Sequence, residues 1–208
     1  MLPLLLAGLS GYLLGSCPTA FLLVHWFSRV DIRQSGSGNV GTLNSYQVTR
    51  SKGIGAAVLC FDLLKGVAAV LVARAIGGGQ FAATSAGGLG AVLGHNFSVW
   101  IRFRGGRGLA TGAGVMLVLA PAVVLLWGIL WSAGFGALRR VNIANALASL
   151  LAAAVLVTVP EGILAPFLAG SANVEEFKIF EVLLFSTILA KHWSPVIEFI
   201  REINANPH

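Results

Sequence analysis

The sequence predicts an all-α membrane protein that forms a single domain over residues 1–208, with seven transmembrane helices. Hydrophobic residues make up 56% of the chain and charged residues only 11%, whereas soluble domains carry about 25% charged residues. The mean hydropathy is +0.84, and apolar runs follow one another along the chain. The basic residues fall in short connectors between these runs. This pattern is typical of a polytopic membrane protein.

Each predicted span is an apolar run long enough to cross a hydrocarbon core, which is about 30 Å thick and needs roughly 20 helical residues. The clear runs cover residues 2–27, 54–75, 81–101 and 141–160, and a last run covers residues 177–190. The run over 109–138 is too long for one simple helix. Pro121 offers a break there, because proline removes a backbone donor and clashes with the preceding turn. We therefore expect two helices, the first of them short.

The positions of the basic residues predict the orientation of the spans. With the N-terminus outside and seven crossings, only Arg74 and Lys178 lie outside, and Lys65 lies within a span. The others all face the cytoplasm: Arg29, Arg33, Arg50, Lys52, Arg102, Arg104, Arg107, Arg139, Arg140, Lys191 and Arg201. Cytoplasmic loops are enriched in Lys and Arg, so we expect a cytoplasmic C-terminus. A single span over 109–138 would place Arg139 and Arg140 on the wrong side.

The tail after Pro195 has an amphipathic pattern. Val196, Phe199, Ile200 and Ile203 recur at helical spacing, with charged residues on the other side. A helix of this kind lies in the plane of the membrane interface. We expect a short interfacial helix at the C-terminus.

Several other classes of protein are excluded. The net charge of +6 comes from the connectors, so we expect no nucleic-acid partner. Cys17 and Cys60 lie inside apolar runs and offer neither a disulfide framework nor metal-ligand spacing, so no metal site is expected. Residues 14–17 look like a lipoprotein cleavage site, but no Lys or Arg precedes them and Pro18 follows. We expect the first run to remain as a span.

A basic, glycine-rich loop separates two of the apolar runs. It holds Arg102, Arg104, Gly105, Gly106, Arg107 and Gly108. The glycines let the backbone turn and expose its amides where the next helix begins. Free N–H groups and the positive end of a helix dipole both favour phosphate. The loop therefore predicts an anion site at a membrane edge.

A second polar loop covers residues 31–52. Its stretch over 36–41 matches the dinucleotide-binding pattern G-x-G-x-x-G, but a membrane span precedes it in place of a strand, so no nucleotide site is expected. The loop holds hydrogen-bonding and basic side chains: Arg33, Ser37, Asn39, Asn44, Arg50 and Lys52. A capped turn between helices is one explanation. Because both loops lie on one face in the predicted topology, a shared anion site is the other.

The motifs occur in an order that resembles a known family. They are residues 12–16, 31–33 and 36–41, Asn44, Asp62 with Lys65 and Gly66, and residues 94–95 and 103–111. This series resembles the bacterial integral-membrane glycerol-3-phosphate acyltransferases that use acyl phosphate as the donor. The resemblance covers most of the chain. That family is understood to have seven spans, with its motifs facing the cytoplasm.

The resemblance implies transfer of a fatty acyl group from acyl phosphate to the 1-hydroxyl of glycerol 3-phosphate, giving lysophosphatidate and phosphate for phospholipid biosynthesis. It implies these two substrates and membrane lipid as partners, no cofactor, and a site on the cytoplasmic face of the bacterial inner membrane. The candidate catalytic residues are Ser37, Asn39 and His95. The candidate substrate-binding residues are Gly36, Gly38, Asn44, Arg50, Arg104, Gly105, Gly106, Arg107, Gly108 and His192. His95 is either a general base or an orienting hydrogen-bond partner.

The chain departs from the family pattern at several positions. Leu43 and Gln47 replace a threonine and an arginine, Arg104 and Arg107 replace lysines, Ser98 replaces a proline, and Pro195 replaces an asparagine. A paralogue without activity is therefore an alternative. A small transporter or binding protein for phosphorylated metabolites is another, but it would place ionisable residues near the bilayer midplane. Only Asp62 and Lys65 are that deep, and we expect them to support the structure.

The missing first-motif arginine leads to a further hypothesis. Arg50 lies three residues after Gln47, about one helical turn along if the segment after Asn44 is helical. Its side chain could then reach the same substrate phosphate. The alternative is that Arg50 marks the cytoplasmic end of the next span.

Overall fold

A computed structural model describes residues 1–169 and 173–205, so a few residues of the predicted domain lie outside it. Within the described ranges the secondary structure is helical, without strands, which confirms the all-α prediction. The α-helices are α1 (Leu2–Ser16), α2 (Thr19–Ser28), α3 (Thr42–Thr49), α4 (Lys52–Ile76), α5 (Phe81–Asn96), α6 (Leu109–Leu119), α7 (Pro121–Leu138), α8 (Val141–Thr158), α9 (Glu161–Leu164), α10 (Val174–Ala190) and α11 (Trp193–Ala205). Short 3-10 turns are η1 (Ile32–Gln34), η2 (Val99–Ile101) and η3 (Ala165–Phe167).

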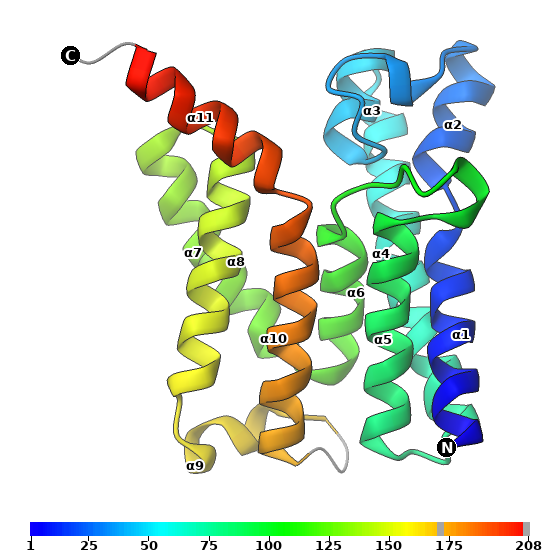
Figure 1. The fold of residues 1–208 in the computed structure, drawn as a ribbon, viewed down its shortest axis with the longest axis vertical. Helices are drawn as coiled ribbons and strands as arrows, with labels where there is room; N and C mark the ends of the chain where they lie inside the picture. The colour runs from blue at the N-terminus through cyan, green and yellow to red at the C-terminus, as the bar shows by residue number, and fades with distance from the viewer. Residues whose placement is uncertain (170–172, 206–208) are drawn as a thin grey trace.

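The long helices lie side by side, with the start of α1 and the end of α11 at opposite ends of the bundle (Figure 1). Four segments are long and apolar enough to cross a membrane by themselves: Leu2–Ser28, Lys52–Ile76, Pro121–Leu138 and Val141–Thr158. The helix α6 is apolar but has only 11 residues, and α5 and α10 have 16 and 17 residues. Helix length therefore supports a multi-pass protein, and the count of seven spans stays a prediction.

The first apolar run, predicted as a span over 2–27, is one of these four segments, but it contains two helices rather than one. Helix α1 ends at Ser16, and Cys17 has a non-helical ψ of 115°. Pro18 follows, and proline disfavours a helical conformation in the residue before it. The run over 81–101 is also shorter than predicted, because Phe97 leaves the helical conformation with φ −131°. The predicted break between α6 and α7 is confirmed at Ala120 and Pro121.

Helices α1 and α5 pack through their backbones. A Cβ atom added at Gly11 would collide with the backbone of Gly87, and one at Gly15 would collide with the backbone of Ala91. Helices α4 and α6 meet in the same way, because a Cβ at Gly66 would collide with the carbonyl of Thr111. Small residues let membrane helices approach closely, and this explains why glycine occurs at helical spacing in these segments.

The polar loops gather at one end of the bundle. Figure 1 shows α2, α3, the segment between α5 and α6, and α11 at that end, with the α4–α5 turn and α9 at the opposite end. Helix α11 begins at Trp193, slightly before the predicted start after Pro195. Its apolar residues Trp193, Ile200 and Ile203 are exposed, as expected for a helix that lies in an interface.

Candidate active site

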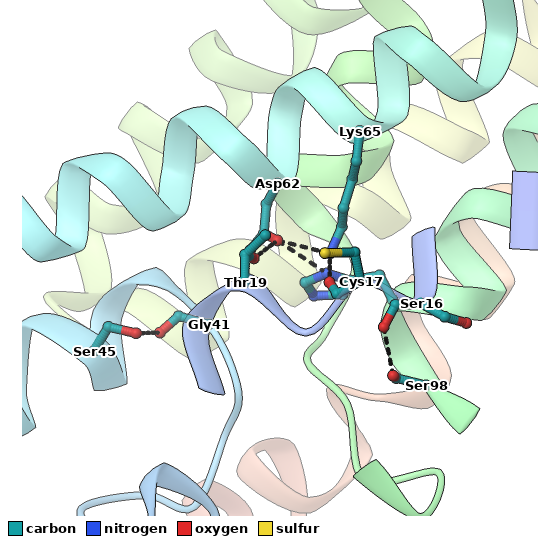
Figure 2. Close-up of polar contacts among 9 residues, drawn as sticks. Ser16, Cys17, Thr19, Gly41, Ser45, Asp62, Lys65 and Ser98 are labelled. Carbon is teal, nitrogen blue, oxygen red and sulfur yellow. Dashed lines mark hydrogen bonds and ion pairs between the residues drawn. The ribbon is translucent and has the colours of Figure 1, made fainter. Parts of the chain in front are cut away.

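The centre of the site is a buried ion pair on α4. The Lys65 Nζ lies 2.8 Å from Oδ1 of Asp62, one helical turn away, and both residues are buried. The hydroxyl of Thr19 donates to the same carboxylate oxygen at 2.5 Å. Lys65 also donates to the backbone carbonyl of Cys17 at 3.0 Å. The break between α1 and α2 supplies this carbonyl, and Figure 2 shows these side chains converging at the break.

His95, near the end of α5, connects this cluster to the basic loop. Its Nδ1 lies 3.5 Å from Oδ1 of Asp62. The backbone N–H of Gly106 donates to the His95 carbonyl at 3.0 Å, and a Cβ at Gly106 would collide with the imidazole Nε2 and approach the Val40 carbonyl. Only glycine fits where the two loops and the imidazole meet.

Asn44 orders the first loop from inside. Its Oδ1 accepts the backbone N–H of Ser37 at 3.0 Å, and its Nδ2 lies 2.9 Å from the Asn39 carbonyl and 3.0 Å from that of Ser35. Gly36 has a left-handed φ of 59°, and a Cβ there would collide with the Asn44 side chain. The amide of Asn44 is therefore occupied by its own loop, and its predicted role in substrate binding is indirect in this geometry.

The start of the same loop is fixed by an ion pair. Arg33 donates from Nη2 to Oδ2 of Asp31 at 2.7 Å, and its guanidinium lies 4.8 Å from the centre of the Phe21 ring. The hydrogen bond from Arg33 lowers the pKa of Asp31 from 3.8 to about 2. Arg33 is therefore held in the loop rather than available to a ligand.

Between the loops and α8 lies a polar cavity of about 170 Å³. Its polar lining includes Asn39, Asp62, His95, Arg107, Asn142 and Asn145. The Nη1 of Arg107 donates to Oδ1 of Asn142 at 2.5 Å. Burial lowers the pKa of Arg107, and the nearby charge of Glu198 opposes this. An arginine remains charged under such a shift, so the cavity offers a fixed cation with donors to spare.

An apolar cavity of about 220 Å³ adjoins the polar one. Leu59, Leu109 and Ala110 line both of them. The rest of the apolar cavity is formed by α6, α7 and α10, with Met116, Trp127 and Phe185 among its walls. The site therefore has a charged compartment and an apolar compartment that share one wall.

The structure brings together only part of the predicted site. Asn39, His95, Arg107 and Gly108 line the polar cavity, with Gly105 and Gly106 directly behind His95. The other candidates lie away from its wall: Gly36, Ser37, Gly38, Asn44, Arg50, Arg104 and His192. Their proposed roles in catalysis or binding stay predictions.

The environments of His192 and Arg50 explain why these two side chains do not line the polar cavity. His192 is 1% exposed at the start of α11, with Nδ1 2.9 Å from the Ile188 carbonyl. Burial lowers the pKa of His192 to about 4. Arg50 is exposed and ends α3 in the left-handed conformation, with φ 55°. The segment after Asn44 is helical as the hypothesis requires, but Arg50 itself has left that helix.

Sequence reasoning missed Asn142 and Asn145 on α8. The signal was present, because two amides three residues apart are unusual in an apolar helix and lie on one face. Hydropathy alone had assigned the segment to a span without a site. Leu59 was also missed, since a leucine in an apolar run carries no signal of its own.

The fold and the site define a class: a multi-pass membrane protein with a charged cavity at one end of an apolar helical bundle. The family model described as glycerol-3-phosphate acyltransferase matches residues 5–202. The chain therefore belongs to the glycerol-3-phosphate acyltransferase family.

Named relatives agree with this assignment. The chain is 48% identical to the glycerol-3-phosphate acyltransferase of Mesorhizobium japonicum over 132 residues, which is 62% of this chain and 65% of that protein. It is 37% identical to the Myxococcus xanthus enzyme of the same name over 193 residues, 93% of this chain and 94% of that protein. The crystal structure of PlsY, an integral membrane glycerol 3-phosphate acyltransferase, in its glycerol 3-phosphate form superposes with a TM-score of 0.80 at 28% identity. That match covers 96% of this chain and 92% of the PlsY chain.

Proposed function

We propose that this protein transfers a fatty acyl group from acyl phosphate to the 1-hydroxyl of glycerol 3-phosphate, giving lysophosphatidate and inorganic phosphate. One observation carries the proposal: the polar cavity around Arg107 shares Leu59, Leu109 and Ala110 with an apolar cavity. A donor with a phosphate head and a lipid tail fits across such a boundary, with the head near the cation and the tail in the apolar compartment.

Arg107 and the first turn of α6 bind phosphate in this proposal. Gly108 precedes α6 with a left-handed φ of 83°, which leaves the amides of the first turn facing the cavity end of the helix. These amides and the guanidinium both stabilise negative charge. Asn39 also lines this cavity and orients substrate oxygens.

In the transfer step, the acceptor hydroxyl oxygen attacks the acyl carbonyl carbon. A new C–O ester bond forms, the bond between that carbon and the phosphate oxygen breaks, and phosphate leaves with the bonding pair. The hydroxyl proton passes to the leaving phosphate. Hydrogen-bond donors directed at the developing oxyanion stabilise the transition state and contribute most of the rate enhancement. We assign His95 to orientation, because its Nδ1 faces Asp62 and its Nε2 lies against Gly106.

We also propose seven spans with the N-terminus outside and the active site facing the cytoplasm of the bacterial inner membrane. The start of α1 and the end of α11 lie at opposite ends of the bundle, which agrees with an odd number of crossings (Figure 1). Labelling of single cysteines at position 140, in a protein without Cys17 and Cys60, tests this orientation. An impermeant reagent added outside the cell should leave that position unlabelled, and labelling there would contradict the seven-span arrangement.

The reaction is tested with purified protein in lipid nanodiscs, given palmitoyl phosphate and glycerol 3-phosphate. We expect phosphate and lysophosphatidate to appear in equal amounts, and only when both substrates are present. Palmitoyl coenzyme A in place of palmitoyl phosphate is the matched control for the donor. Absence of product with either donor would favour the inactive paralogue, and product from the thioester alone would contradict the donor assignment.

A further inference from the structure

Two amide side chains on α8 have their oxygens already occupied. Oδ1 of Asn142 accepts from Arg107 at 2.5 Å, and Oδ1 of Asn145 accepts from the indole N–H of Trp131 at 2.7 Å. A guanidinium and an indole can only donate, so the atom that faces each of them must be the amide oxygen. The NH₂ group of each asparagine is thereby turned away from its partner, and both side chains line the polar cavity.

The indole of Trp131 is held in place by a stack of aromatic rings on α7. Its ring lies 5.1 Å from that of Phe135, at an interplanar angle of 2°, and 6.4 Å from that of Trp127. Trp127 donates to the hydroxyl of Ser149 at 3.0 Å, one turn further along α8. The α7 helix thus presents two fixed indole donors to α8, but only the Trp131 donor reaches a residue of the polar cavity.

This contact decides which end of the Asn145 amide faces the cavity. The two ends of a side-chain amide have nearly the same shape, so packing alone does not choose between them. One orientation offers N–H donors to an anion, and the other offers an oxygen that repels it. Within the described part of the chain, no protein acceptor is found for the Asn145 Nδ2, which leaves this donor to a ligand.

We infer that Trp131 is a positioning residue for the acceptor substrate and acts through Asn145. The indole N–H holds the amide oxygen, so that Asn145 Nδ2 donates to the phosphate of glycerol 3-phosphate. The inference rests on the proposed function for the identity of this ligand. Trp131 itself touches neither substrate, and its effect is on the affinity for the acceptor rather than on the acyl group.

The experiment measures the Kd of glycerol 3-phosphate by calorimetry on the full-length protein in nanodiscs. Trp131→Phe removes the indole N–H and keeps an aromatic ring in the stack, and Asn145→Ala removes the amide. Asn145→Ala should weaken binding about tenfold, because it loses a donor to a charged group. Trp131→Phe should weaken binding by up to the same factor, because the Asn145 amide is then free to turn its oxygen toward the phosphate. The double variant should bind no more weakly than Asn145→Ala alone. Ser149→Ala is the matched control, since it breaks the other hydrogen bond from an α7 indole to α8 at a residue that lines neither cavity, and it should keep the wild-type Kd.

A simple packing role for Trp131 would give additive losses in the double variant, and this result would overturn the inference. So would a wild-type Kd in Trp131→Phe. If Trp131→Phe fails to fold, Asn145→Ala still decides, because an unchanged Kd there excludes the amide as a ligand donor. A wild-type protein that binds glycerol 3-phosphate but transfers no acyl group would refute the proposed function and leave the binding test intact. A wild-type protein without affinity for glycerol 3-phosphate would overturn both.

Discussion

Helices α1 and α5 meet through their backbones, whereas α7 and α8 meet through side chains. Gly15 has the backbone of Ala91 where a side chain would be, and Gly11 has that of Gly87. On α7, by contrast, a Cβ at Gly134 would lie at an ordinary contact distance, 3.7 Å from the Cα of Ala144, and one at Gly128 would have nothing within 4 Å. Trp127 and Trp131 reach across to α8. The first contact holds the loops and the ion pair rigidly. In the contact between α7 and α8, individual side chains position the hydrogen-bond donors. Single substitutions there can therefore change the contacts with a ligand.

The largest effect on stability is expected at the ion pair of Asp62 and Lys65. This pair lies in the half of the bundle that contains α1 and α5, whereas α7 and α8 belong to the other half. Lys65→Met leaves the buried carboxylate of Asp62 without its cation, and breaking a buried pair from one side costs about 3 to 5 kcal/mol. Chemical unfolding in detergent measures the loss. The double change of Asp62→Asn with Lys65→Met should recover much of it, because no buried charge remains. An equal loss in the double variant would mean that the lysine acts through its bond to Cys17.

The next largest effect on stability is expected from the difference between Gly15 on α1, which has no room for a methyl group, and Gly128 on α7, which has room. Gly15→Ala forces apart the backbones of α1 and α5, and overpacking of this kind costs about 3 kcal/mol. Gly128→Ala adds the same methyl group on α7 and should cause no loss in the free energy of unfolding. Equal melting temperatures for the two variants would remove the distinction between the two halves.

Arg107 lies where the two halves meet, because it belongs to the basic loop and donates to Asn142 of α8. Arg107→Ala should lower kcat/KM by roughly ten- to hundredfold, as expected for the loss of a charge-assisted hydrogen bond. Arg107→Lys retains the charge and should lose much less. Steady-state kinetics for both substrates measures this, with circular dichroism as the check on folding. Wild-type kcat/KM in Arg107→Ala would separate the loop from catalysis.

The smallest effect is expected at Arg50, which leaves α3 in a left-handed conformation and lies away from the polar cavity wall. Arg50→Ala should change the KM for glycerol 3-phosphate less than about threefold, an effect below about 0.7 kcal/mol. The double change of Gln47→Arg with Arg50→Ala serves as the comparison. A large rise in KM for the single variant, recovered in the double, would instead establish that Arg50 replaces the missing arginine.

The sequence predicts most of what depends on local chemistry. Hydropathy locates the helices, Pro121 marks the break after Ala120, and the basic loop draws attention to Arg107, which lines the polar cavity. Pro18 carried the same signal as Pro121, but the run over 2–27 has a length that one helix can fill, whereas the run over 109–138 is too long. The length of an apolar run does not reveal whether the helix within it is continuous.

What depends on tertiary contact could not be predicted. The burial of His192 results from the turn between α10 and α11, and the neighbourhood of Asn145 and Trp131 results from the packing of α8 on α7. In the described structure, the hydrogen bonds of the Asn44 amide all go to its own loop, and its contact with substrate stays a prediction. Polar residue types indicate a site, but only the fold decides which of them face it.

The walls of the polar cavity come from distant points of the chain, from Asn39 to Asn145. During synthesis the N-terminal helices emerge first, so the loop around Asn39 and the ion pair on α4 can form before α8 leaves the ribosome. The cavity is closed only when α8 has been inserted. A nascent chain halted before α8 would contain both polar loops, over 31–52 and 102–108, but would lack a complete polar cavity. Acyl transfer would therefore begin only after insertion of α8.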